Sequence, residues 1–459
     1  MFRTRDSVGS FPWEAGPEDL DHPLALGAQP RTRRDLLADA AAVADRLGAA
    51  GARTLMLACR DRYHVAAGLL GAWATGGVAV LPSNLRADTV QDQARRAGAD
   101  LVLSDDGSLG QDLRQVLDGR PARSAPAPAA IPGRRPVAVV FTSGSSGQSV
   151  ACAKTADQLL GEAVFLARFF RFTRETRVLA TAPPHHLYGL LFGVLAPLIG
   201  GSAFIRSSSP LPGGIAGLAR AFRPTILCAV PAHLEGVTSL DPDDLATVET
   251  VFCSGGVLDE RTRRELTRFP FSIVEIFGSS ESGGIAFRDP RTTTAWRPFE
   301  GITVAADDQG RLLLDSPFLP PDGPRPFPCA DLVAIDEDGT FQHGGRADSV
   351  VKIGGERVSV AEIEQRLRSV PGVSDAAVRA IATGGARQWE LWAAVVAPDL
   401  TEASIRAALS SSLDTVAIPR RILFESALPR EDSGKLVHDR FVALFGSQPA
   451  TPVTIEPVG

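Results

Sequence analysis

Glycine and hydroxyl side chains crowd into residues 142–149 of this 459-residue chain. The apolar, β-branched run at residues 137–140 precedes them and predicts a buried strand, and a helical pattern begins after them at about Asp157. Glycines let the backbone of such a loop approach a ligand, and its successive N–H groups form a concave anion site. A phosphate chain is therefore the candidate ligand for Thr142, Ser143, Gly144, Ser145, Ser146 and Gly147.

Two common nucleotide loops do not fit this run. A Walker A loop carries a lysine directly after its last glycine, but no lysine follows Gly147, and the dinucleotide pattern Gly-x-Gly-x-x-Gly is absent from this stretch. A small-residue turn without a ligand is the alternative interpretation. The order Thr-Ser-Gly-Ser-Ser-Gly nevertheless resembles the phosphate loop of the adenylate-forming superfamily, which comprises the acyl- and aryl-CoA synthetases and their relatives.

A second group of polar residues follows a predicted strand at residues 178–180. His186 comes after two prolines there, and open α/β sheets bind ligands at the carboxyl ends of their strands, although a lone histidine is also common in a core. The segment resembles the superfamily's carboxylate pocket, which implies substrate contacts for His186, Tyr188 and Gly189. Amino-acid-activating relatives place an aspartate where His186 lies, so the resemblance implies an acid without an α-amino group.

A third strand end carries Ser254, Gly255 and Gly256 after the predicted strand at residues 251–253. Glycines at this position allow the backbone to lie flat against a base or an acyl group, and they are equally compatible with a tight turn. The superfamily has a Ser/Gly-rich turn here, against which adenine and the substrate lie. The resemblance therefore adds these three residues to the predicted nucleotide and substrate site.

A motif at residues 277–283 joins an aromatic ring, a glycine, hydroxyls and a carboxylate at one strand end. A glutamate beside phosphates requires an intervening cation, and Mg²⁺ takes one or two carboxylates plus phosphate oxygens, although surface glutamates are common. The motif resembles the superfamily's aromatic-Gly-x-Thr-Glu sequence, here Phe277, Gly278, Ser280 and Glu281. The resemblance implies that the phenyl ring stacks on adenine, that Ser280 contacts the α-phosphate and that Glu281 binds Mg²⁺.

Motifs nearer the C-terminus extend the resemblance. Asp331 lies where a turn aspartate is also common, and the resemblance implies that it accepts both ribose hydroxyls. In the run from residue 345 to 358, Arg346 is implied to contact ribose or phosphate and Asp348 to lie at a hinge. Gly354 and Gly355 are implied to enter the active site for the second half-reaction.

The lysines of the predicted site depart from the superfamily pattern at one place. The superfamily's phosphate loop continues with a lysine where this chain has Val150, and we predict that Lys154 reaches the β/γ-phosphates instead. Lys435, in Ser-Gly-Lys near the C-terminus, is implied to contact the carboxylate and the α-phosphate, where a cation stabilises charge that develops during adenylation. The predicted catalytic residues are therefore Lys435, His186 and Glu281.

Composition narrows the class of protein. A formal net charge of −6 and a pI of about 5.7 argue against nucleic acid or an anionic membrane surface as the main partner. Five scattered cysteines fit reduced thiols, and no signal peptide is evident at the start, so we expect a cytoplasmic protein. The uncharged residues 187–205 are interrupted by glycine and proline, which predicts a buried helix, a turn and a strand rather than a membrane span.

The periodicity of the chain predicts its architecture. Alternating strand and helix patterns up to about residue 276 predict α/β sheets, with residues 105–136 as a surface connection. Short alternating runs at residues 296–341 predict a small antiparallel β unit, and a later α+β pattern, with Ser359 capping a helix, predicts a separate domain. We predict an AMP-binding domain at residues 1–345, a hinge at 346–350 and a mobile C-terminal domain at 351–459.

The resemblance covers about residues 32–441 and implies one reaction sequence. ATP and Mg²⁺ would activate a carboxylic acid, aryl or unsaturated acyl, to an acyl-AMP, and the thiol of coenzyme A or an acyl carrier protein would then accept the acyl group. Val150 motivates an alternative, a nucleotide-binding relative that has lost turnover. A serine hydrolase does not fit, because no Gly-x-Ser-x-Gly elbow surrounds Ser145, Ser254 or Ser280.

Overall fold

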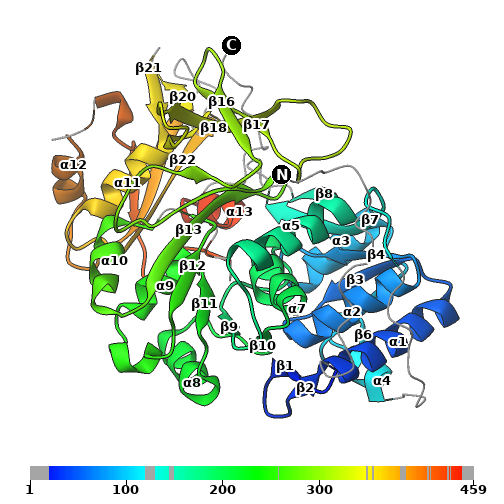
Figure 1. The fold of residues 1–459 in the computed structure, drawn as a ribbon. Coiled ribbons are helices and arrows are strands. Elements are labelled where there is room, and N and C mark those ends of the chain that lie inside the picture. The colour runs from blue at the N-terminus through cyan, green and yellow to red at the C-terminus, as the bar shows by residue number, and fades with distance from the viewer. Residues whose placement is uncertain are drawn as a thin grey trace. The chain divides into compact units, whose positions relative to one another are not determined.

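The computed structural model describes residues 20–118, 130–143, 149–256, 258–347, 350–353, 356–382, 389–410, 413, 415–431, 434 and 436–446. The chain divides into two compact units (Figure 1). The N-terminal unit contains the chain up to Ser143, Ser149–Ile302 and Asp315–Gly323. The C-terminal unit contains Thr303–Leu314 and the chain from Pro324 onward.

A six-stranded sheet forms one part of the N-terminal unit, in the order β6-β5-β3-β4-β7-β8. Neighbouring strands are parallel except β7 and β8, which form an antiparallel pair. The strands are β3 (Thr54–Ala58), β4 (Val78–Leu81), β5 (Leu101–Ser104), β6 (Gln111–Asp112), β7 (Pro136–Ser143) and β8 (Ser149–Thr155). The helices are α1 (Arg33–Ala50), α2 (Arg62–Ala74), α3 (Ala87–Ala97), α4 (Leu113–Asp118) and α5 (Ala156–Phe169).

Local signals explain where these helices begin and end. The Thr32 hydroxyl accepts a hydrogen bond from the backbone N–H of Asp35 at 3.1 Å, the Asp35 carboxylate accepts one from Thr32 at 2.9 Å, and α1 ends where Gly51 adopts a φ of 63°.

The prediction of a surface connection at residues 105–136 was wrong in part, because β6 and α4 lie within it. Leu113 and Leu117 of α4 are buried, and this tertiary packing stabilises a helix too short to show periodicity.

A nine-stranded sheet forms the other part of the N-terminal unit, in the order β15-β14-β13-β12-β11-β9-β10-β1-β2. Its six central strands are parallel, and antiparallel strands flank them on both sides. The strands are β1 (Pro23–Leu26), β2 (Arg31–Thr32), β9 (Arg177–Ala180), β10 (Ala203–Ile205), β11 (Ile226–Ala229), β12 (Thr250–Cys253), β13 (Ser272–Ser279), β14 (Gly283–Arg288) and β15 (Arg297–Pro298). The helical segments are α6 (Leu187–Leu190), η2 (Leu191–Leu195), α7 (Ala196–Gly200), α8 (Pro212–Phe222), α9 (Pro231–Val237), η3 (Pro242–Leu245), α10 (Glu260–Glu265) and η4 (Leu266–Arg268).

The uncharged segment at residues 187–205 has the predicted form of buried helix, turn and buried strand. Its helical part runs from α6 through the π-helical η2 to α7, Gly201 makes the turn with a φ of 75°, and β10 follows. Across the part of the chain that the structure describes, no helix has the length and apolar character needed to cross a membrane.

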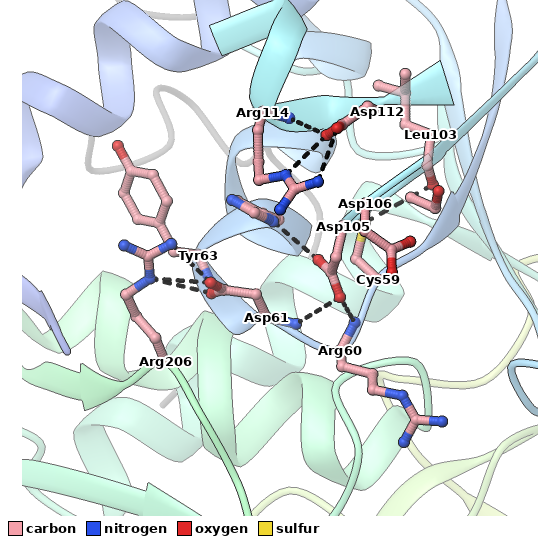
Figure 2. A network of polar contacts seen from close by, with 12 residues as sticks. Cys59, Arg60, Asp61, Tyr63, Leu103, Asp105, Asp106, Asp112, Arg114 and Arg206 are labelled. Carbon is pink, nitrogen blue, oxygen red and sulfur yellow. Dashed lines mark hydrogen bonds and ion pairs between the residues drawn. The ribbon is translucent and has the colours of Figure 1, made fainter. Parts of the chain in front are cut away.

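Polar contacts join the two sheets of the N-terminal unit (Figure 2). Asp61 caps α2 by accepting a hydrogen bond from the N–H of Tyr63 at 2.9 Å. Its carboxylate also pairs with Arg206, directly after β10, with an N–O distance of 2.6 Å. Asp105, after β5, accepts hydrogen bonds from the N–H of Arg60 at 2.6 Å and from His64 at 2.8 Å. These contacts fix the loops at the carboxyl ends of β3, β5 and β10 relative to one another.

The C-terminal unit contains the small β unit and the α+β part. A four-stranded sheet has the order β16-β17-β18-β19, β20 pairs with β21, and a three-stranded sheet has the order β22-β23-β24. The elements are β16 (Thr303–Ala306), β17 (Arg311–Asp315), β18 (Phe327–Ile335), β19 (Phe341–Arg346), β20 (Val350–Ile353), β21 (Glu356–Ser359), α11 (Val360–Ser369), β22 (Asp375–Ala382), β23 (Trp389–Val396), α12 (Glu402–Ser410), η6 (Thr415–Ala417), β24 (Arg421–Phe424) and α13 (His438–Leu444). The Ser359 hydroxyl caps α11 as predicted, accepting from the N–H of Glu362 at 3.2 Å.

The predicted fold class is confirmed: α/β sheets, a small antiparallel β unit and an α+β C-terminal part are all present. The four-stranded sheet clusters with the C-terminal unit. The predicted domain limits and the hinge at residues 346–350 stay predictions.

Candidate active site

The residues that flank the predicted phosphate loop are paired with each other in the β7–β8 hairpin. In the strand pairing, Thr142 lies opposite Val150 and Ser143 opposite Ser149, so the two strands close on residues 144–148. The loop residues Gly144, Ser145, Ser146 and Gly147 themselves lie outside the described residues. Helix α3 supports the hairpin, because Arg96 donates a hydrogen bond to the carbonyl oxygen of Ser149 at 2.6 Å.

The β13–β14 turn carries the predicted adenine and Mg²⁺ residues. Phe277 lies on β13 with its ring 5.4 Å from that of Trp296, and Ser280 and Glu281 form the tip of the turn, with Glu281 exposed. Only a glycine fits at position 278, since a Cβ there would lie 2.4 Å from the carbonyl oxygen of Gly283. The tight hairpin therefore places Glu281 at a strand end, as its motif predicts.

The β7–β8 hairpin contacts this turn directly. The Cys152 thiol donates to the carbonyl oxygen of Ser280 at 3.3 Å, and the Lys154 ammonium donates to the carbonyl oxygen of Glu281 at 3.2 Å. Strand β8 and this turn, about 130 residues apart in the sequence, are thus adjacent in the folded chain. The side chain of Lys154 is buried, whereas Val150 is 53% exposed. The predicted contact of Lys154 with the β/γ-phosphates stays a prediction.

Glu162 on α5 is a buried carboxylate that the sequence reasoning missed. Its Oε1 accepts a hydrogen bond from the N–H of Gly284 at 2.6 Å, immediately after the β13–β14 turn. Burial raises the pKa of Glu162 to about 7, and the nearby charge of Lys154 and the bond from Gly284 oppose that rise. The available signal was a glutamate on the apolar face of a helix, beside Leu159, Ala163 and Leu166.

Glu162→Gln is expected to change how stability depends on pH. The pKa of this carboxyl is near 4.5 in the unfolded chain and about 7 in the folded protein. The free energy of unfolding of the wild type therefore falls as the pH rises between these two values, because only the unfolded chain can ionise the group freely. At about 1.4 kcal/mol per pH unit, the free energy of unfolding should shift in favour of the variant by roughly 2–3 kcal/mol between pH 5 and pH 8. Urea unfolding of both proteins at the two pH values measures this; an unchanged difference would contradict the raised pKa.

His186 and its neighbours lie at the carboxyl end of β9. His186 is the N-cap residue of α6, half-buried, and its ring centroid is 4.7 Å from that of the buried His185. Burial, more than the neighbouring cationic side chains, lowers the pKa of His185 well below its usual range, so this ring is neutral. Tyr188 lies two residues after His186, with its ring 5.1 Å from that of Phe192.

The third predicted strand end is built around main-chain contacts. The Ser254 hydroxyl donates to the carbonyl oxygen of Ile276 at 2.8 Å, which ties the end of β12 to β13. Gly255 has a φ of 87°, a conformation that favours glycine, and both Gly255 and Gly256 are exposed. The predicted contacts of these residues with base and acyl group stay predictions.

Gly189→Ala is expected to reduce substrate activation. A Cβ at this position would lie 2.1 Å from the carbonyl oxygen of Pro183 and 2.8 Å from that of Ala182, so the segment that carries His186 must move. The Ala182 oxygen already accepts a hydrogen bond from buried Arg62 at 2.6 Å, which resists the movement. We expect pyrophosphate exchange to fall about tenfold or more, with a larger rise in KM for the acid than for ATP.

The matched control is Gly213→Ala on α8, where nothing lies within 4 Å of an added Cβ. It should leave exchange within about twofold of the wild-type rate. Equal effects of the two substitutions, or an unchanged KM for the acid in Gly189→Ala, would argue against a substrate pocket at His186.

The C-terminal unit contains its own group of predicted site residues. Asp331, on β18, accepts a hydrogen bond from His343 of β19 at 2.9 Å, and Arg346 lies 3.9 Å from its second carboxylate oxygen. His343 belongs to none of the predicted motifs, and the pairing of β18 with β19 brings it to Asp331. The predicted residues Asp348, Gly354, Gly355 and Lys435 lie outside the described residues.

The comparisons with known proteins agree with this geometry. A family model for the AMP-binding enzyme matches residues 21–339, and one for the AMP-binding enzyme C-terminal domain matches residues 362–435. The chain belongs to the AMP-binding enzyme family, the adenylate-forming ligases, and is an acid–thiol ligase of the AMP-forming class. The resemblance stated from its motifs is thereby confirmed.

Individual relatives are moderately similar. A 4-coumarate–CoA ligase of Cereibacter sphaeroides is 30% identical over 64% of this chain and 69% of that protein. A p-hydroxybenzoic acid–AMP ligase of Mycobacterium tuberculosis is 29% identical over 68% of this chain and 49% of that protein. The solved O-succinylbenzoate coenzyme A synthetase of Bacillus subtilis, in complex with ATP and magnesium ion, has the same fold with a TM-score of 0.80 at 18% identity, covering 92% of this chain and 96% of that chain.

The donor set at the turn suits a nucleotide-borne Mg²⁺. Among the described residues, no group of three His, Cys, Asp or Glu side chains could hold a metal by itself. Glu281 provides one exposed carboxylate beside the hydroxyl-bearing Ser279 and Ser280. Mg²⁺ that arrives with phosphates needs few protein ligands, since phosphate oxygens and water complete its shell.

Proposed function

We propose that the protein activates a carboxylic acid with ATP to give an acyl-AMP and pyrophosphate, and then transfers the acyl group to a thiol with release of AMP. In the first step, a carboxylate oxygen attacks the α-phosphorus and pyrophosphate leaves. In the second, the thiol sulfur attacks the acyl carbon and AMP leaves. Adenylation makes the second step feasible because AMP is a far better leaving group than a carboxylate oxygen.

One observation carries the proposal. Strand β8, which follows the phosphate loop, is hydrogen-bonded to the turn that carries Glu281. Loop N–H groups and a carboxylate are complementary parts of a site for a metal-bound triphosphate, because the N–H groups bind phosphate oxygens and the carboxylate binds the cation. These bonds place β8, the strand that follows the loop, against the turn that carries the carboxylate.

The residues of this chain then have separate tasks. Thr142 to Gly147 bind phosphates, Phe277 stacks on adenine, and Asp331 and Arg346 bind ribose and phosphate. Mg²⁺, when bound by Glu281, neutralises charge on the phosphates. His186, with Tyr188 and Gly189, borders the acid, and Lys435 stabilises charge that develops on the carboxylate and α-phosphate.

We infer an aryl or unsaturated acyl substrate. The named substrates of the two relatives, 4-coumarate and p-hydroxybenzoic acid, are aryl acids. In this chain the segment after His186 is apolar and buried through η2, and it offers no acidic side chain to pair with a substrate ammonium. The acid should therefore be flat and apolar and should lack an α-amino group.

Carboxylate-dependent exchange of pyrophosphate into ATP tests the first half-reaction. The panel should contain hydroxycinnamates, benzoates, medium-chain fatty acids, malonate and α-amino acids. We expect exchange with one or more of the aryl or unsaturated acids and none with the amino acids. Tight ATP binding without exchange for any acid would instead favour a relative that has lost turnover.

The acceptor thiol needs a second assay. Thioester formation should be followed with coenzyme A and with a phosphopantetheine-loaded carrier protein, each supplied with the accepted acid and ATP. Product with only one of them identifies the acceptor; acyl-AMP accumulation without either product would remove the transfer step from the proposal.

A further inference from the structure

We propose that Lys154 and Glu162 form a clamp on the β13–β14 turn and act as positioning residues for the Glu281 carboxylate. The Lys154–Glu162 clamp rests on the proposed function, because it gives the Mg²⁺-binding role of Glu281 a structural support. It assigns to Lys154 a task different from a direct contact with the β/γ-phosphates.

The clamp contacts the backbone at the tip of the turn and again near the start of β14. Lys154 donates to the carbonyl oxygen of Glu281 at 3.2 Å, and Glu162 accepts from the N–H of Gly284 at 2.6 Å. Gly283, between these points, has a φ of 73°, and a Cβ there would lie 2.6 Å from Oε2 of Glu162. The carboxylate can therefore approach the turn only because position 283 is a glycine, and the backbone of Glu281 is held while its side chain stays exposed.

The clamp itself is rigidly built. Lys154 is the penultimate residue of β8, and Glu162 lies two turns into α5. The capping box of Thr155 and Gln158 fixes the corner between them. In that box the Gln158 side chain accepts from the N–H of Thr155 at 3.0 Å. A strand end and a helix joined by a capped corner keep the two charged groups at a constant separation.

Burial argues for a positioning task. Lys154 is 1% exposed and Glu162 is 3% exposed. Buried opposite charges give little net stability compared with apolar residues of the same volume, because both lose their hydration. Apolar residues, however, could not form hydrogen bonds with the main-chain oxygen of Glu281 and the N–H of Gly284. These two bonds fix the turn.

The strand geometry separates Lys154 from the phosphate loop. Side chains alternate along β8, so Val150, Cys152 and Lys154 share one face, and the last two both contact the turn. Four residues of strand place Lys154 roughly 13 Å along β8 from Val150, where the superfamily carries its loop lysine. Val150 is exposed at the loop end, whereas Lys154 is buried at the turn.

A double-mutant cycle with Glu281 tests the clamp. ATP binding by the full-length protein is measured by isothermal titration calorimetry at pH 8, with and without Mg²⁺, for wild type, Lys154→Met, Glu281→Gln and the double variant. If Lys154 acts through Glu281, Lys154→Met should weaken Mg²⁺-dependent ATP binding about tenfold in the wild-type background and less than about twofold in the Glu281→Gln background.

Three outcomes would overturn the clamp. Equal losses in the two backgrounds would show that Lys154 contacts the phosphates directly. A lower melting temperature with unchanged Mg²⁺-dependent binding would show a purely structural role. If Lys154→Met weakened ATP binding to the same extent with and without Mg²⁺, its effect would not depend on the cation.

Glu162 gives a second test that holds even if Lys154→Met fails to fold. Glu162→Ala, which removes the acceptor for the N–H of Gly284, should weaken Mg²⁺-dependent ATP binding about tenfold. Glu162→Gln keeps an acceptor and should stay within about threefold of wild type. Equal effects of the two substitutions would overturn the grip on Gly284.

Arg206→Met is the matched control, because it breaks a half-buried ion pair with Asp61 on other elements of the same unit. It should leave Mg²⁺-dependent ATP binding unchanged.

If wild type binds ATP with Mg²⁺ but no acid supports exchange, the proposed function fails, while the double-mutant cycle still tests the clamp. If wild type binds no ATP, both fall.

Discussion

Lys435→Ala is expected to lower carboxylate-dependent pyrophosphate exchange by about two to three orders of magnitude. Negative charge develops on the α-phosphate and the acid as they join, and a removed cationic donor at such a site typically costs about 10²–10³-fold. Transfer from a supplied acyl-adenylate to the thiol should persist, within about tenfold of the wild-type rate, because the phosphate–carboxylate bond is already made. Exchange and single-turnover transfer assays measure the two half-reactions separately.

Lys435 lies outside the described residues, but the residue before it, Gly434, has a described contact. Arg430 donates to the carbonyl oxygen of Gly434 at 2.9 Å and forms two bonds, of 2.7 and 2.8 Å, with the Asp375 carboxylate. The preceding residue is thus fixed to the C-terminal unit. Arg440→Ala, an exposed cation on α13, is the control and should leave exchange unchanged. Equal losses of exchange and transfer in Lys435→Ala would remove its assignment to adenylation.

Glu281→Ala is expected to reduce exchange about a hundredfold at millimolar Mg²⁺, with partial recovery as Mg²⁺ is raised. A carboxylate that binds the cation directly contributes at least as much as the supporting groups around a metal, whose removal costs about 10–100-fold. The measurement is the exchange rate as a function of Mg²⁺ at saturating ATP and acid. A loss that Mg²⁺ does not relieve would point to a role other than cation binding.

Glu300→Ala is the matched control for Glu281→Ala. Glu300 is an exposed glutamate of the same unit that no predicted motif contains. Its removal should leave both the rate and the Mg²⁺ dependence unchanged. Equivalent effects of the two substitutions would mean that general surface charge, rather than a specific ligand, causes the loss.

Much of the secondary structure was predictable from local pattern. The strands predicted at residues 137–140, 178–180 and 251–253 are parts of β7, β9 and β12, and the helical pattern that begins at about Asp157 is α5. These elements have clear periodicity or β-branched runs with turn residues on each side, so local propensity and burial agree. Helix α4 shows the limit, since its six residues depend on the packing of Leu113 and Leu117.

The sequence by itself determined the family, the α/β class and most candidate residues, because each motif places glycine, hydroxyl or charge directly after a strand. Only the tertiary structure decided which motifs meet: Lys154 on the Glu281 turn, Glu162 on Gly284 and His343 on Asp331. These partners are 12 to 127 residues apart in the sequence. Strand register and helix docking bring them together, and neither leaves a mark in the local pattern of either partner.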